Sequence, residues 1–209
     1  GMVSNILHEY ITSDTTAPTL YSSTPADNSY VAAPVTEIAL TILETTTQID
    51  PAATAQGTVN DGQADIPGSW SIAYNIVTFT PDTPLADGTY TVTINPTDAP
   101  LGNTSQASVS FTVDTLPPAA PTLTPPASPT NVDQALLSGT KDADTSLWLN
   151  GVVIMAMGVE TDWTYTVTLS EGTNDYELYC LDRAGNMSPA TVFAIALDRT
   201  PPALIATDP

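Results

Sequence analysis

One short pattern occurs three times along this 209-residue chain, and its spacing limits how the chain can fold. The pattern is Asp-x-x-x-Pro, at residues 14–18, 114–118 and 198–202. Successive copies start 100 and 84 residues apart, and each interval has the length of one small domain. Proline at such points stiffens a connection between domains. The pattern therefore predicts two complete modules in series, joined by semi-rigid linkers.

Between the linkers the sequence alternates with the period of two that half-buried antiparallel strands require. In the first interval, apolar and polar residues alternate at 37–42 and again at 90–94, after an Asp-Gly turn. In the second interval they alternate at 163–169, and Asn150-Gly151 has the composition of a tight hairpin turn between two strands. Both intervals are therefore expected to form antiparallel sheets.

Helices have little room in this chain, because proline occurs 19 times and is excluded from helix interiors. The segment near the start that lacks both proline and glycine, residues 2–17, is the one place where a helix can nucleate. We expect an all-β chain. The expected domains are 14–114 and 115–198, with an N-terminal extension at 1–13 that begins with a cloning remnant, and with a linker and the truncated start of a further module at 199–209.

Four segments of the first interval resemble a known family. They are 24–28 (TPADN), 79–81 (FTP), 85–92 (LADGTYTV) and 111–114 (FTVD), and their order is similar to that of the bacterial immunoglobulin-like (Ig-like) domain. The resemblance implies an Ig-like β-sandwich. It also implies a tyrosine corner at Tyr90, whose hydroxyl would bond an upstream backbone group.

The second interval resembles the same class of module, but through a different set of motifs. Trp-x-Tyr-x-Val-x-Leu at 163–169 is followed by Glu-Gly-Thr-Asn at 171–174 and Asp-x-x-Gly-Asn at 182–186. This order is similar to Ig-like repeats of bacterial surface proteins and to accessory domains of some polysaccharide-degrading enzymes. The chain is therefore interpreted as two tandem Ig-like sandwiches from an extracellular or cell-surface protein.

The charge balance excludes two classes of partner. The chain carries 23 acidic residues against three Lys and Arg residues, for a formal net charge of −20. Such a surface repels nucleic-acid phosphates and anionic membranes. No stretch approaches the roughly 20 apolar residues of a membrane-spanning helix. We therefore expect no nucleic-acid partner and no membrane insertion.

The residues that enzymes use are isolated or missing. His8 is the only histidine and lies in the expected extension, whereas a nucleophilic triad needs a base beside the nucleophile. Cys180 is the only cysteine, in an apolar run, and is expected to be a buried small hydrophobe rather than a reactive thiol. The sequence has no phosphate-binding loop, Cys/His cluster or EF-hand loop. It predicts a chain that is not an enzyme.

Calcium is the one cofactor that the acidic residues suggest. Ca²⁺ binds six to eight oxygens, and aspartates of the linkers and of the loops beside them are candidate ligands at module junctions. These candidates are Asp98, Asp114, Asp182 and Asp198, and further acidic loops lie at 60–65 and 142–144. The alternative is that each aspartate only accepts backbone N–H groups in an Asx-turn. The sequence leaves both open.

Sugar recognition is the other candidate interaction, through exposed tryptophans. Trp163 begins a core-facing alternation and is expected to be buried, which leaves Trp70 or Trp148 as a stacking platform. The function that fits best is a non-catalytic structural and adhesive spacer of a larger bacterial cell-surface or secreted protein. The alternative is an accessory, carbohydrate-binding module of a secreted polysaccharide-active enzyme. The partners would be an unidentified protein or polysaccharide and flanking domains of the same parent chain.

Overall fold

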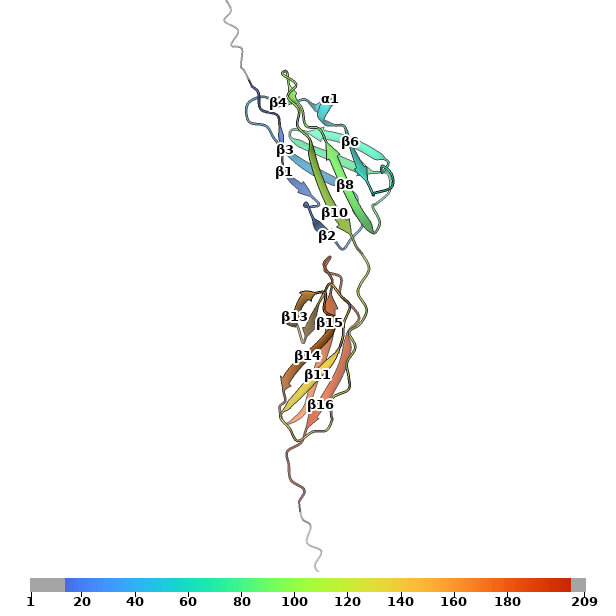
Figure 1. Ribbon diagram of the computed structural model, residues 1–209, viewed down its shortest axis with the longest axis vertical. Helices are drawn as coiled ribbons and strands as arrows, with labels where there is room; N and C mark the ends of the chain where they lie inside the picture. Colours follow the sequence, from blue (N-terminus) through green and yellow to red (C-terminus); the bar gives the residue numbers. More distant parts are fainter. Residues whose placement is uncertain (1–13, 204–209) are drawn as a thin grey trace, which may run out of the picture. The chain divides into compact units, whose positions relative to one another are not determined.

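The structure is a computed structural model that describes residues 14–203 (Figure 1). It divides into two compact units with the boundary between Asp114 and Thr115, and each is described by itself. Module 1 denotes residues 14–114 and module 2 residues 115–198. The expectations for residues 1–13, including His8, and for 204–209 lie outside the described residues. No helix among the described residues is long and apolar enough to cross a membrane.

Module 1 is a sandwich of two four-stranded sheets. One sheet has the order β1-β3-β7-β6 and the other the order β2-β10-β8-β5. The strands are β1 Thr19–Thr24, β2 Ser29–Val31, β3 Ile38–Leu43, β5 Gly57–Asn60, β6 Gly68–Ala73, β7 Ile76–Pro81, β8 Gly88–Ile94 and β10 Ala107–Val113. All pairings are antiparallel except that of β10 with β2. This division of strands between two sheets is that of Ig-type sandwiches.

The alternation seen in the sequence places the core between the sheets. Ile38, Leu40 and Ile42 of β3 are buried, while the residues between them are partly exposed. Phe79 on β7 and Phe111 on β10 bring the largest side chains from opposite sheets into one cluster. The strands expected at 37–42 and 90–94 are therefore confirmed, because each buries every second residue.

A short ladder and one helical turn lie at one end of module 1. The ladder pairs β4 Gln48–Ile49 with β9 Asp98–Ala99, and the turn is α1, Pro51–Thr54. This helical turn lies outside 2–17, the segment in which the sequence left room for a helix, and residues 14–17 are not helical. Asp50 caps α1 by accepting the backbone N–H groups of its first turn, and Pro51 stands where the missing N–H costs nothing. Proline here starts a helix rather than preventing one.

Module 2 has the same plan with one strand moved. Its sheets are β11-β14 and β13-β12-β15-β16. Strand β13 pairs with β12 instead of joining the β11-β14 sheet. The strands are β11 Gln134–Thr140, β12 Thr145–Leu149, β13 Val152–Gly158, β14 Asp162–Thr168, β15 Gly172–Leu181 and β16 Thr191–Leu197. The backbone N–H groups of Thr122 and Thr124 bond to carbonyls of β11, so this extended segment takes the place of a first strand.

Three local predictions are confirmed in the described residues. Asn150 and Gly151 have φ of 48° and 78°, as the expected hairpin turn between β12 and β13 requires. The hydroxyl of Tyr90 donates to the carbonyl of Ala86 at 2.9 Å, which forms the tyrosine corner. Cys180 is fully buried in the core of module 2.

Candidate cation site in the first module

Three carboxylates from separate segments meet at the end of module 1 that carries β4 and α1. Asp14 begins the first linker pattern, Glu44 directly follows β3, and Asp98 begins β9. One carboxylate oxygen from each lies within 4.8 Å of the others. Asp14 is 8% exposed and Asp98 is 1% exposed, while Glu44 is half-buried. Of these three residues, only Asp98 was predicted from the sequence as a candidate ligand.

Asn103 holds Asp98 in place. Both carboxylate oxygens of Asp98 accept hydrogen bonds from Asn103, one from its backbone N–H and one from its side-chain amide, each at 2.7 Å. The same amide donates to the backbone carbonyl of Asp14 at 3.0 Å. The loop after β9 therefore fixes the Asp98 carboxylate and ties it to the start of the linker.

Asp14 uses only one of its two carboxylate oxygens. Its Oδ1 accepts hydrogen bonds from the hydroxyl and from the backbone N–H of Thr16. These bonds hold the pKa of the Asp14 carboxyl below its ordinary value of 3.8, against the opposing effect of burial. Asp14 is therefore ionised at neutral pH. Its Oδ2 is buried and has no hydrogen-bond partner.

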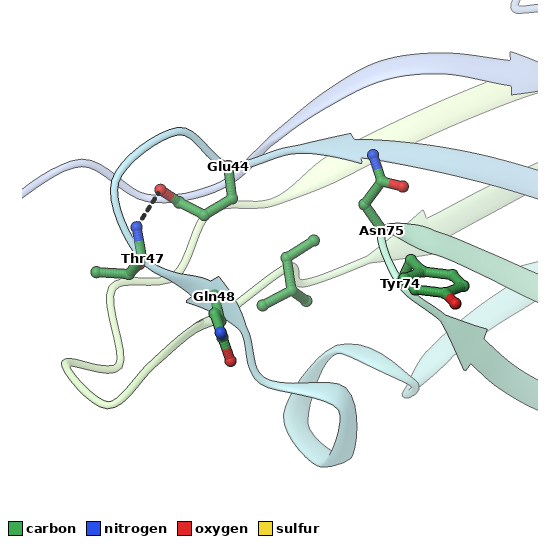
Figure 2. A pocket seen from close by; sticks show the side chains of 6 residues that line it. Glu44, Thr47, Gln48, Tyr74 and Asn75 are labelled. Atoms are coloured by element: carbon green, nitrogen blue, oxygen red, sulfur yellow. Dashed lines mark hydrogen bonds between the residues drawn. The ribbon is translucent and has the colours of Figure 1, made fainter.

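Glu44 is oriented by the loop that follows it. Its Oε1 accepts hydrogen bonds from the backbone N–H groups of Thr45, Thr46 and Thr47, at 2.8, 2.8 and 3.2 Å. The bond to Thr47 is drawn in Figure 2. The hydroxyl of Thr47 is buried and helps to lower the pKa of the Asp14 carboxyl, although no hydrogen bond of ordinary length and angle joins the two groups.

No side chain of module 1 balances these charges. Residues 14–114 contain no Lys, Arg or His. In module 2 the residue that directly follows β11, the strand corresponding to β3, is Lys141 rather than a glutamate. The ammonium of Lys141 is buried and donates to the backbone carbonyls of Thr145 and Gly158, at 2.9 and 3.4 Å. Module 2 therefore carries a positive charge where module 1 carries a negative one.

Two of the other predicted ligands, Asp182 and Asp198, make the hydrogen bonds of a turn. Asp182 accepts the backbone N–H and the side-chain amide of Asn186, both at 2.9 Å, which repeats the arrangement of Asp98 in module 1. Asp198 accepts the backbone N–H of Thr200 at 3.0 Å and the Thr200 hydroxyl, as Asp14 does with its own threonine. These contacts are those of the Asx-turn alternative.

In each module, the candidate aspartate in a loop lies far from the candidate aspartate at the end of the module. Strands β8 and β10 pair Gly88 with Val113, so Asp114 follows the end of β10 that lies next to β2. Asp98 lies at the other end, with β4 (Figure 1). The pairing of β15 with β16 separates Asp182 from Asp198 in the same way. The two aspartates of each pair therefore lie at opposite ends of their module, and Asn103 links Asp98 instead to the backbone of Asp14.

The remaining acidic loops have local partners. Asp61 accepts the backbone N–H groups of Gln63 and Ala64, both at 2.9 Å, and these bonds lower the pKa of its carboxyl. Asp144 forms an ion pair with Arg183 at 2.8 Å. Both residues lie in exposed loops and have local partners.

None of the three tryptophans is an exposed platform. Trp163 is buried, as expected. Trp70 packs against Phe79, with ring centroids 4.9 Å apart, and Trp148 stacks on Tyr179 at 6.1 Å. Both are only partly exposed.

The most exposed aromatic side chain among residues 14–203 is Tyr74, in the turn between β6 and β7, which is 99% exposed. It borders a pocket of about 400 Å³ that Glu44, Thr47, Gln48 and Asn75 also line (Figure 2). Its φ of 57° is a left-handed conformation that favours glycine. An isolated tyrosine outside the alternating strands gave the sequence analysis no reason to select it.

The fold is thus that of tandem Ig-like sandwiches, and comparison with known proteins gives the same class. Residues 14–113 match the family described as bacterial Ig-like domain. The first module is therefore similar to that family over almost its whole length. No curated protein matches the chain.

The solved structures to which the chain is similar have low sequence identity with it. The fibronectin(III)-like modules of Clostridium thermocellum CbhA are 16% identical with a TM-score of 0.55, and the match covers 91% of this chain and 100% of that one. CopC from Methylosinus trichosporium OB3b is 20% identical with a TM-score of 0.40, over 46% of this chain and 93% of CopC. The CbhA match extends the sandwich fold across both modules.

Proposed function

We propose that this chain is a spacer of a bacterial cell-surface or secreted protein, in which its modules separate other domains or contact a partner directly. An Ig-like module is a structural, non-catalytic unit, and domains of this family occur in bacterial surface proteins. A spacer role also requires that the modules can be joined in series.

The observation that carries the proposal is the repeated geometry of the joint. At the start of module 1, Asp14 accepts hydrogen bonds from the N–H and hydroxyl of Thr16, and at the end of module 2, Asp198 does the same with Thr200. Proline follows two residues later in both places, where it restricts the backbone. The same turned and stiffened connection at both places suits modules that follow one another in a row.

The two cores also support a spacer. The buried cluster of module 1 contains residues 35–113 only, and that of module 2 contains residues 137–197 only. Each module therefore has what it needs to fold alone, so modules can be added without a shared core.

A replacement experiment in the parent protein tests the spacer role. Residues 14–198 are deleted in one variant and exchanged in another for two unrelated Ig-like modules of equal length. A spacer predicts that the exchange keeps the parent's activity at the cell surface and that the deletion reduces it. An exchange variant as defective as the deletion would show that these modules act through their own surface, which contradicts the spacer role.

A carbohydrate-binding accessory role is the second candidate, and the observation that favours it is Tyr74. A fully exposed ring held in a left-handed turn, beside the polar side chains of Gln48 and Asn75, is a surface on which a sugar ring can stack. The test is titration with a panel of soluble polysaccharides. Binding that Tyr74→Ala abolishes and that Tyr21→Ala, at another exposed tyrosine, leaves unchanged would support it. No binding by the unaltered chain would refute it.

A further inference from the structure

We propose that the free edge of β14 in module 2 binds an extended peptide segment of a partner protein, which adds to the sheet as a further strand. The segment has apolar side chains at alternate positions, contains no Asp or Glu, and carries Lys or Arg at its ends. The edge and the groove beside it belong to module 2 alone. The inference therefore depends neither on the spacer role nor on how the two modules are placed.

Module 1 shows what occupies the corresponding edge. There β7 pairs with β3 on one side and with β6 on the other. In module 2, β14 pairs with β11, the counterpart of β3, and the two form a two-stranded sheet. The strand before β14 is β13, which pairs with β12 in the opposite sheet. Among residues 14–203, the edge of β14 that faces away from β11 therefore has no strand, whereas β6 covers this edge in module 1.

The free edge of β14 presents backbone hydrogen-bonding groups. At one end of the pairing with β11, the N–H of Lys141 donates to the carbonyl of Thr161. At the other end, the N–H of Leu169 donates to the carbonyl of Asp133. In an antiparallel pair, residues that bond to the partner strand alternate with residues whose N–H and C=O groups point the other way. The even-numbered residues of β14 therefore direct these groups to the free edge, where an added strand can bond to them.

A groove of about 320 Å³ lies beside this edge, between β14 and β13. Tyr165 pairs with Leu137, and Val152 pairs with Leu149. Both leucines are buried, and paired residues point to the same face of a sheet, so Tyr165 and Val152 point inward. Tyr165 is nevertheless 37% exposed and Val152 is 62% exposed. The sandwich of module 2 is therefore open along this edge.

In module 1 the strand at this edge closes the sandwich with apolar side chains. Trp70 and Ile72 alternate along β6, and both pack against the core cluster of module 1. The groove of module 2 offers Ile154, Val167 and Tyr176 to side chains of the same kind. A strand with apolar residues at alternate positions would remove this apolar surface from water.

Charge selects the kind of partner. The residues that line the groove are uncharged, while Glu160 and Asp162 are exposed where β14 begins. The chain has a net charge of −20, and its three cations are already engaged: Lys141 is buried, and Arg183 and Arg199 form ion pairs. A second copy of the chain would therefore be repelled, whereas a segment with basic ends is attracted.

Fluorescence anisotropy with the full chain and a labelled synthetic peptide tests the proposal. The peptide has the sequence of β6, Gly68–Ala73, with two lysines added at each end. It should bind with a dissociation constant of about 1 mM or tighter, and it should slow the hydrogen exchange of the amides of Thr164 and Thr166. A control peptide with serine in place of the Trp and Ile keeps the charge and should bind at least about tenfold more weakly.

Two substitutions in module 2 locate the peptide. Val152→Lys places a positive charge at the groove and should weaken binding by roughly tenfold or more. Val192→Lys makes the same change at an exposed valine of β16 and should alter binding by less than about twofold.

Thr166→Pro distinguishes strand addition from side-chain contacts alone. It removes a backbone donor from the free edge, where proline leaves the pairing with β11 intact. It should abolish binding, and the melting temperature of module 2 shows whether the variant is folded. If it is not, the two valine variants still decide where the peptide binds.

Five results would overturn the proposal. The first is no saturable binding of the peptide, and the second is equal binding of the control peptide, since the lysines alone would then explain it. The third is an equal effect of Val152→Lys and Val192→Lys, which would place the peptide elsewhere, such as at β7 in exchange for β6. The fourth is binding to a folded Thr166→Pro variant. The last is a dimer in sedimentation that Val152→Lys dissociates, because a second copy would then occupy the edge.

Discussion

Replacing Tyr90 by phenylalanine removes a single hydrogen bond from module 1 and leaves the ring in place. The ring of Tyr90 is buried and stacks with Phe111, with centroids 5.8 Å apart, and phenylalanine can keep both contacts. What is lost is the bond from the hydroxyl to the carbonyl of Ala86. Such a bond contributes about 1 kcal/mol net, and leaving an acceptor buried and unpaired would cost up to about 3 kcal/mol. Because Ala86 is exposed, water can reach its carbonyl, and the lower value applies.

The expected loss of about 1 kcal/mol corresponds to a fall of roughly 4–8 °C in the melting temperature of a module of this size. Differential scanning calorimetry of the full chain measures it, and the melting temperature of module 2 should not change. Tyr74→Phe, at a fully exposed tyrosine of the same module, is the matched control and should stay within about 0.5 kcal/mol of the unaltered chain. Equal effects of the two substitutions would refute the assignment of a stabilising role to the tyrosine corner.

Three further predictions concern module 2 and its linker. Gly139→Ala should lower the melting temperature of module 2 by about 4 °C or more, because the added Cβ would lie 2.0 Å from the carbonyl oxygen of Thr122; an unchanged transition in calorimetry would contradict this packing. The thiol of Cys180 should react with an aromatic disulfide reagent at pH 8 only after unfolding, since it is buried and burial raises its pKa; reaction in the native state at the rate of a free cysteine would show that it is accessible. The side-chain and backbone hydrogen bonds from Thr200 hold the pKa of Asp198 below 3.8, so the stability they add is complete above that value and is lost as the pH falls through the folded pKa. Thr200→Ala should return this pKa, measured by NMR titration, towards its ordinary value, and a pKa that does not rise would be the contrary result.

The strands were predictable because their signal is local. In β3 and β8 large apolar residues alternate with small or polar ones, and every second residue is buried. The Asn150-Gly151 turn fixes the start of β13. The helical turn α1 was not predicted, because proline is excluded from helix interiors and Pro51 lies in this turn. The signal was present in Asp50-Pro51, where an N-cap residue precedes proline at the first helical position.

The candidate cation site was only half visible in the sequence. Asp98 stood out through its loop motif, and Asp14 was present in the first linker pattern, but nothing in the sequence shows that they meet. Their contact depends on antiparallel strands that place Asp98 and Asp114 at opposite ends of module 1. Glu44 stands alone after a strand and carries no motif, so only the fold brings it to the other two.

The central claim is that this chain consists of two self-contained Ig-like modules, and calorimetry of two core variants tests it most directly. Leu40→Ala empties a buried position in module 1 and Leu178→Ala does so in module 2, and each should cost about 2–5 kcal/mol. The account predicts that each substitution lowers the melting temperature of its own module and leaves that of the other unchanged. A single transition that both substitutions lower together would contradict it.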